Sequence, residues 1–142
     1  NYIFYMKQVF DTLKFKTNGK QLINITDDIN HFVNENLINE GLLNLSILHT
    51  SASLLIQENA DETVLFDLLN FFNNVTKNIK YFHDSEGEDD MPAHIRSALT
   101  QSNLSLSINK KNIILGLWQG IFLFEHREQS KTRSVFVHII GR

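Results

Sequence analysis

Acidic and imidazole side chains are concentrated in one short stretch, residues 83–94. It holds five of the sixteen carboxylates of the chain, two of its six histidines and its only proline. Carboxylate and imidazole groups bind divalent metals, and imidazole also transfers protons near neutral pH. We therefore expect His83 and His94 to be metal ligands, and Glu86 and Asp90 to take part in catalysis or to hold those ligands in place. The alternative is a solvated acidic loop that leads into a capped helix.

A helix is predicted to begin at Pro92, within this stretch. Proline fits the first helical turn, where an N–H group would have no helical partner. Asp89 and Asp90 come directly before it, where an acidic side chain can cap the helix and meet the positive end of its dipole. His94 then lies in the first turn. The dipole disfavours imidazolium there, so we expect His94 to be free to bind a metal or accept a proton.

Two further histidines, His49 and His126, lie at the ends of predicted strands. No His-Glu-x-x-His or other short metal-binding motif is present. Histidines that are far apart in sequence can still converge on one cleft, as the ligands of hydrolytic zinc enzymes do. We expect His83, His94 and His126 to hold an ion, and His49 to be a further ligand or a base. For each histidine taken alone, a structural role is the alternative.

Hydroxyl and guanidinium groups provide candidate phosphate contacts. In an extended chain His49, Ser51 and Ser53 share one face. Glycine does not flank Ser51, so no nucleophile elbow is present, and we expect Ser51 to bind a phosphate or another ligand. Arg127 can grip a phosphate by forked hydrogen bonds, or it can form a surface ion pair that stabilises little.

The only tryptophan, Trp118, lies between Gly116 and Gly120. Glycine within a strand region often marks a bulge or a place where a ligand approaches the backbone closely. Trp118 is therefore either a ligand contact or a residue that a bulge packs into the core.

Composition narrows the class of protein. The chain has 142 residues, 42% of them hydrophobic, which fits one domain, residues 1–142, with a real core. The net charge is −3 and no basic stripe is present, so we expect no nucleic-acid partner. No cysteine is available for disulfides or thiolate chemistry. No apolar run approaches membrane-spanning length and the first residues do not form a signal peptide, so we expect no membrane partner and a cytoplasmic location.

The elements that must position these residues are about seven strands and three helices. Strands are grouped at both ends of the sequence, which favours an α+β fold over a doubly wound one. Asn18-Gly19 predicts a tight hairpin between two of these strands. Asn59 and Glu62 have capping-box spacing and begin a helix whose wide apolar stripe should face a sheet.

Several motifs occur in an order that is highly specific as a set. This set resembles the YjbQ-type family, identified with secondary thiamine-phosphate synthase activity, and it spans nearly the whole chain. The motifs are His49-Thr50-Ser51-Ala52-Ser53, His83 with Glu86-Gly87, Asp90-Met91-Pro92-Ala93-His94-Ile95, Gly116 with Trp118-Gln119-Gly120, and Glu125-His126-Arg127.

The resemblance implies a fold, an assembly and an activity. The fold is a seven-stranded β-sandwich of two sheets flanked by helices, and the assembly is a homotrimer. The site is rich in histidine and holds a divalent metal ion, zinc or magnesium. The reaction joins a hydroxymethylpyrimidine pyrophosphate to a thiazole phosphate and releases pyrophosphate, so the partner is a small phosphorylated substrate. The alternatives are a metal-dependent hydrolase and a non-enzymatic trimer that binds a metal or small molecule.

Overall fold

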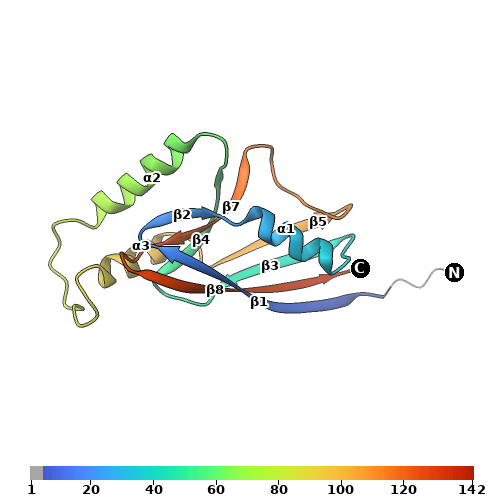
Figure 1. The fold of residues 1–142 in the computed structure, drawn as a ribbon, viewed down its shortest axis with the longest axis horizontal. Helices are drawn as coiled ribbons and strands as arrows, with labels where there is room; N and C mark the ends of the chain where they lie inside the picture. The colour runs from blue at the N-terminus through green and yellow to red at the C-terminus, as the bar shows by residue number, and fades with distance from the viewer. Residues whose placement is uncertain (1–4) are drawn as a thin grey trace.

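The computed structural model of the chain describes residues 5–142 (Figure 1). Within them lie three helices and eight strands, arranged as two antiparallel sheets, so the α+β class is confirmed. Eight strands replace the seven expected, because pairings as short as the two-residue β6 leave no clear sequence pattern. The five-stranded sheet runs β1 (Lys7–Asn18), β8 (Ser130–Gly141), β3 (Gly41–Ile47), β5 (Asn103–Asn109) and β6 (Asn112–Ile113), and the three-stranded sheet runs β2 (Gln21–Asn24), β7 (Gln119–Glu125) and β4 (Ala52–Glu58).

The core lies between the two sheets and under α1 (Thr26–Glu35). Period-two alternation sends one set of side chains inward from each strand. In the pairing of β3 with β8, Leu43 lies opposite Ile139, and all such inward residues are buried. α1 adds Ile29 and Val33, both fully buried, from one helical face. Each such side chain contributes roughly 1.5–3 kcal/mol on burial.

The predicted hairpin at Asn18-Gly19 is wrong. β1 pairs with β8 along its whole length and β2 pairs with β7, so the chain passes from one sheet to the other at this turn. Gly19 has a φ of +85°, which suits glycine, and this positive φ is the local property that Asn-Gly signals. The pattern therefore located the turn but not the strand partners, which are set by the long pairing of β1 with β8.

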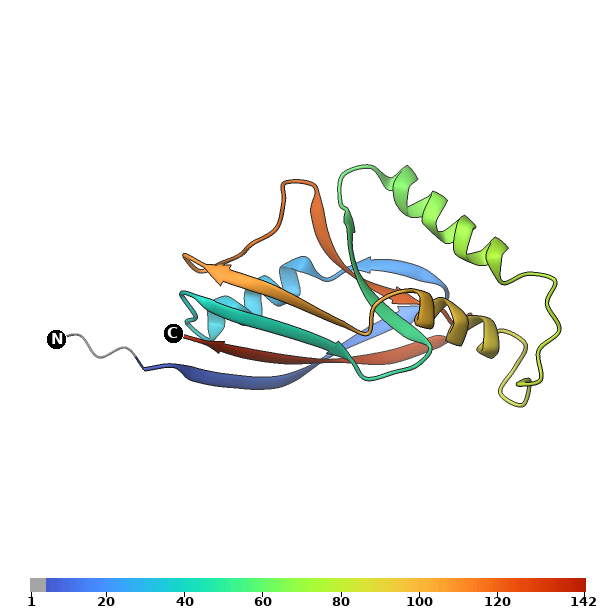
Figure 2. The same cartoon turned by 180° about the vertical axis from the view of Figure 1, so that it is seen from behind.

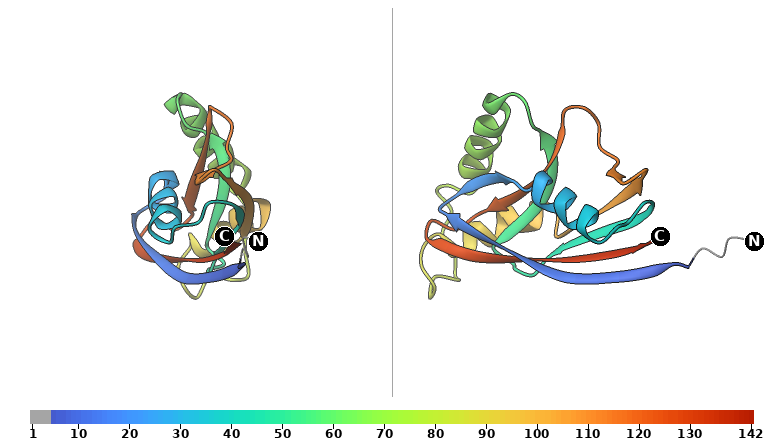
Figure 3. Two further views of the ribbon diagram at one scale, coloured as in Figure 1. Left: turned by 90° about the vertical axis from the view of Figure 1, so that its right-hand side faces the viewer. Right: turned by 45° about the vertical axis from the view of Figure 1, so that its right-hand side comes forward.

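The second helix, α2 (Glu62–Val75), rises from the body of the molecule (Figures 1 and 3). Asp61 caps it by accepting a hydrogen bond from the Thr63 backbone N–H at 2.9 Å, two positions after Asn59, the predicted cap. Its apolar stripe meets the sheet only in part, as where the rings of Phe72 and Phe124 pack edge to face at 5.5 Å. No residue of α2 is fully buried, and Phe66 remains 63% exposed.

The third helix, α3 (Asp90–Leu99), follows a long loop, residues 76–89, at the end of the molecule away from both termini (Figure 2). It begins two residues before Pro92, which keeps the proline within the first turn. This start places Asp90 and His94 one turn apart on the same helical face. None of the helices in residues 5–142 is long and apolar enough to cross a membrane.

Candidate functional site

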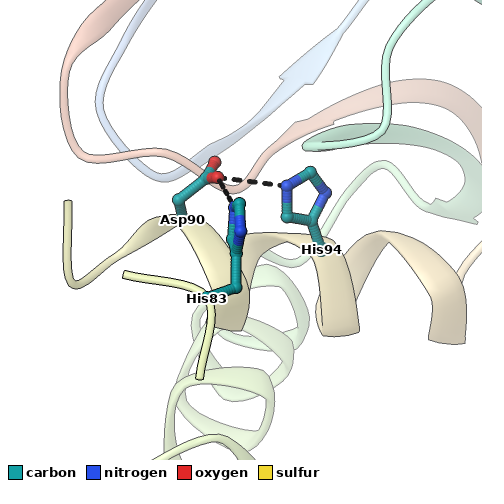
Figure 4. Close-up of side chains that lie close together, drawn as sticks. All are labelled: His83, Asp90 and His94. Atoms are coloured by element: carbon teal, nitrogen blue, oxygen red, sulfur yellow. Dashed lines mark hydrogen bonds and ion pairs between the residues drawn. The ribbon is translucent and has the colours of Figure 1, made fainter. Parts of the chain in front are cut away.

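Asp90 is the centre of a cluster at the start of α3 (Figure 4). Its carboxylate is 1% exposed, and one oxygen, Oδ2, lies 2.7 Å from His83 Nε2 and 3.1 Å from His94 Nε2. His83 comes from the loop before the helix and His94 from one turn further along it. Both imidazoles remain partly open to solvent. The three groups therefore form a site that small molecules can reach.

The backbone carbonyl of Thr50 fixes the orientation of His94. Its oxygen lies 2.9 Å from His94 Nδ1, and a carbonyl oxygen can only accept, so Nδ1 carries a proton. In a neutral imidazole the other nitrogen, Nε2, then presents a lone pair to the Asp90 carboxylate, which also only accepts. Two acceptors at 3.1 Å need a shared proton or a cation between them. The local geometry thus favours either an added proton or a metal at this point.

His83, His94 and Arg127 together hold the Asp90 carboxylate in its ionised form. Arg127 is buried at the turn after β7, and its NH1 donates to Asp90 Oδ1 at 2.6 Å while its Nε donates to Asp89 Oδ2 at 2.9 Å. Burial acts to raise the pKa of Asp90, but the hydrogen bond from His83 and the charges of His94 and Arg127 outweigh it and keep the pKa below its usual range. An ionised carboxylate between two imidazoles is therefore maintained at neutral pH.

The donor set fits a divalent metal. Nitrogens of His83 and His94 and an oxygen of Asp90 lie within 4.8 Å of one another. Two imidazoles and one carboxylate are the ligands of many zinc and other first-row metal sites, whereas magnesium prefers oxygen ligands. The Thr50 carbonyl supplies the second hydrogen bond that metal-binding histidines usually make. The present 2.7 and 3.1 Å separations are those of hydrogen bonds, so the rings would draw slightly apart around an ion.

His126, the third predicted ligand, does not join this cluster. It follows β7 directly and is fully buried, with Nε2 hydrogen-bonded to Ser53 Oγ at 2.8 Å. Its Nδ1 is buried without a partner among the described residues. Burial, followed by the positive charges of Arg96 and Arg133, lowers the pKa of His126 to about 3. Asp90, and not His126, is the residue whose side chain lies beside both His83 and His94.

His49 and Ser51 belong to a different hydrogen-bond network. His49 Nε2 accepts from the Ser134 backbone N–H at 2.8 Å, which occupies the nitrogen that a base would use. Burial and the charge of Arg133 lower the pKa of His49, although Glu125 opposes this. Ser51 Oγ accepts from Arg133 NH2 at 3.0 Å, and the same nitrogen donates to the buried Glu125 at 2.5 Å. The predicted base and phosphate contact are thus committed to internal bonds.

The remaining predicted residues have structural contacts or lie elsewhere. Arg127 uses its guanidinium on Asp89, Asp90 and the Glu86 carbonyl, so its donors are turned inward and not toward an open phosphate site. Glu86 hydrogen-bonds through that carbonyl, and its carboxylate acts on Arg127 only by its charge. Trp118 is 60% exposed in the segment before β7, so it is not packed into the core.

Sequence reasoning expected Asp90 to take part in catalysis or to hold the metal ligands in place. The four-residue spacing of Asp90 and His94, which places both on one face of a helix, is the signal that the two side chains lie together. The hydrogen bond of His94 to the Thr50 carbonyl joins residues 44 positions apart, and no local pattern signals it.

Comparison with known proteins gives a consistent picture over nearly the whole chain. The family model described as UPF0047 protein YjbQ-like matches residues 11–142. A UPF0047 protein of Synechocystis sp. is 44% identical over 137 residues, covering 95% of this chain and 93% of the relative. The UPF0047 protein YjbQ of Escherichia coli O157:H7 is 43% identical over 132 residues, covering 92% and 94%.

Solved structures agree. An uncharacterised YjbQ/UPF0047 family protein of Clostridium acetobutylicum is 32% identical, with a TM-score of 0.80 and coverage of 92% of this chain and 98% of that one. A YbjQ-like protein of unknown function from Sulfolobus solfataricus P2 shares the fold with a TM-score of 0.87 at 23% identity, covering 97% and 100%. From the match of both motifs and fold, the chain belongs to the YjbQ-like UPF0047 family.

Proposed function

We propose that this protein is an enzyme of the thiamine-phosphate synthase type, acting in the cytoplasm on small phosphorylated substrates. The observation that supports an enzyme is the buried, ionised Asp90 carboxylate shared by two partly open imidazoles. The choice of reaction rests on the family resemblance. It joins a hydroxymethylpyrimidine pyrophosphate to a thiazole phosphate.

In this reaction the bond between the pyrimidine methylene carbon and pyrophosphate oxygen breaks, and a bond to the thiazole ring nitrogen forms. The departing pyrophosphate carries away the electron pair as negative charge, which positive groups at the site must stabilise. A divalent metal, when bound by His83, His94 and Asp90, would supply such charge. Thr50 orients His94, and Arg127 helps to keep Asp90 ionised, so these two residues preorganise the site.

Two alternatives share the same donor set. A metal-dependent hydrolase also uses imidazole and carboxylate ligands with an open position for water, and the partial exposure of His83 and His94 is compatible with that use. A non-enzymatic trimer that binds a metal or small molecule would retain the ion without turnover.

We expect the purified protein to retain about one divalent metal per chain and to release pyrophosphate from the paired substrates. His83→Ala and His94→Ala should each lower metal affinity by about 100-fold and abolish turnover, because a three-ligand site that lacks one arm is no longer preorganised. Metal content and pyrophosphate release, measured on the same preparations, check this.

His31→Ala and His138→Ala are the matched controls. His31 pairs with Glu35 on α1 and His138 stacks on Phe10, so neither contacts Asp90 and both variants should keep full metal. Metal without pyrophosphate release would favour the binding protein. Phosphate ester hydrolysis in its place would favour the hydrolase.

We also propose a homotrimer. Support comes from the apolar side chains that one chain leaves in solvent on and near α2, among them Phe66 at 63%, Phe71 at 60% and Phe82 fully exposed. Exposed apolar surface of this kind marks an interaction site. Light scattering at micromolar concentration should return three chains per particle, and a stable monomer would contradict the assembly.

A further inference from the structure

Arg96 of α3 is a buried cation whose hydrogen bonds within residues 5–142 go only to neutral acceptors. It is 4% exposed, its NH1 donates to Thr76 Oγ1 at 3.0 Å, and its NH2 donates to the His126 carbonyl oxygen at 2.7 Å. Its Nε is buried without a hydrogen bond, and no carboxylate within residues 5–142 forms an ion pair with it. The carboxylates of Asp89 and Glu128 act on its charge only from beyond ion-pair distance. A buried charge held only by neutral acceptors is costly, and an anion would relieve that cost.

A cleft of about 490 Å³ adjoins this side chain. It lies between the C-terminal half of α2, the first turns of α3 and the turn after β7, and Arg96, Asn73, Lys20 and Lys77 contribute to its walls. The cleft is open to solvent, so a ligand can enter it. Lys77 adds positive charge, Lys20 is paired with Glu128, and Asn73 adds an amide that can donate hydrogen bonds.

The cleft also leads toward the Asp90 cluster. A second cleft of about 400 Å³ reaches His83 and shares Thr76, Glu88 and Pro92 with the first. A ligand with two ends, such as a pyrophosphate ester, can therefore place one end in the first cleft and the other beside the histidines.

Acidic groups in the cleft are mostly neutralised. Asp89 is held by Arg127, and Glu128 Oε1 lies 3.7 Å from Lys20 Nζ. Glu88 is exposed at the rim and has no ion pair among the described residues. It is the one acid expected to repel an anion from this cleft.

We propose that this cleft is an anion subsite that binds a phosphate or pyrophosphate group, with Arg96 at its back and Lys77 at its side. The naming of pyrophosphate rests on the proposed function, since that is the group released. The inference that an anion binds here does not rest on the proposed function, because it follows from the buried charge of Arg96, which has no ion-pair partner among residues 5–142.

Calorimetric titration of the whole protein with inorganic pyrophosphate, in the presence of EDTA, tests the subsite without metal or turnover. Arg96→Lys should weaken binding by about tenfold, because lysine keeps the charge but cannot make both hydrogen bonds that hold the guanidinium at the cleft. Lys77→Gln should weaken it by about threefold, and Glu88→Gln should strengthen it by a similar factor. Lys111→Gln is the charge-matched control in the turn after β5, at the opposite end of the molecule, and should bind as the parent protein does (Figure 1).

Lys77 and Glu88 are exposed, so their variants keep the test decisive even where Arg96→Lys fails to fold. Equal affinity in Lys77→Gln, Glu88→Gln and Lys111→Gln would overturn the subsite. So would binding that is lost in His94→Ala but kept in Arg96→Lys, which would place the anion at the Asp90 cluster and leave the proposed function standing. If the variants showed the expected order of pyrophosphate affinities but the protein released no pyrophosphate from the substrates, the subsite would be supported and the synthase rejected.

Discussion

Asp90→Ala is expected to lower the free energy of unfolding by about 3 kcal/mol and to remove bound metal. The carboxylate is buried, accepts from Arg127 NH1 and lies within hydrogen-bond distance of His83 Nε2 and His94 Nε2. Removing one member of a buried ion pair leaves the other charge uncompensated, which typically costs about 3–5 kcal/mol. Arg127 keeps its bonds to Asp89, so we expect the lower end of that range. Urea unfolding and metal analysis of the same sample measure both effects.

Asp90→Asn separates the two effects. Asparagine keeps an oxygen acceptor of the same shape, so we expect a smaller loss of stability, about 1–2 kcal/mol, but the same loss of metal because the ligand charge is gone. Glu86→Gln is the matched control in the same loop. Glu86 hydrogen-bonds to the site through its backbone carbonyl, and its carboxylate is the weakest of the acidic charges that act on Arg127, so stability and metal should both be largely kept. An Asp90→Asn protein that retained full metal would exclude Asp90 as a ligand.

The sequence predicted the start of α3 to within two residues because the signals are local. Pro92 fits the first turn, and Asp90 and His94 follow from helix periodicity once that start is placed. The role of Asp90 did not follow. A capping aspartate was expected, yet neither Asp89 nor Asp90 caps the helix with its side chain, because tertiary partners bind both carboxylates. Long-range charge pairing therefore overrides the local capping preference.

The burial of His126 could not be predicted from the sequence either. Strand alternation predicts one buried and one open face, but β7 is buried on both, with Leu123 in the core between the sheets and Phe124 packed against α2. A central strand covered on both sides gives a continuous apolar run, which does not say where the next polar residue points. His126 comes directly after this strand, and its burial depends on contacts with Ser53 and Arg96, both remote in sequence.

The burial of His126 predicts that the free energy of unfolding falls steeply in mild acid. The pKa of His126 is lowered to about 3, chiefly by burial and then by Arg96 and Arg133, whereas an unfolded histidine titrates near pH 6.5. Between these values the unfolded chain binds a proton that the folded chain does not, so stability falls as the pH falls. One such proton corresponds to about 1.4 kcal/mol per pH unit. From pH 6.5 to pH 5, His126 alone should therefore lower the free energy of unfolding by about 2 kcal/mol.

His126→Gln isolates this effect, because glutamine can hydrogen-bond to Ser53 but does not titrate. The variant should be less stable than the parent at pH 7 and should lose about 2 kcal/mol less between pH 6.5 and pH 5. Urea unfolding at several pH values above 5 measures this difference, and that range avoids the titration of Asp89 and Asp90, whose pKa values lie below their usual range. His31→Gln is the control, since the side chain of His31 is 74% exposed and stays in solvent when the chain unfolds. If His126→Gln kept the pH dependence of the parent protein, the proton would bind elsewhere, and a buried, uncharged His126 would not explain the acid sensitivity.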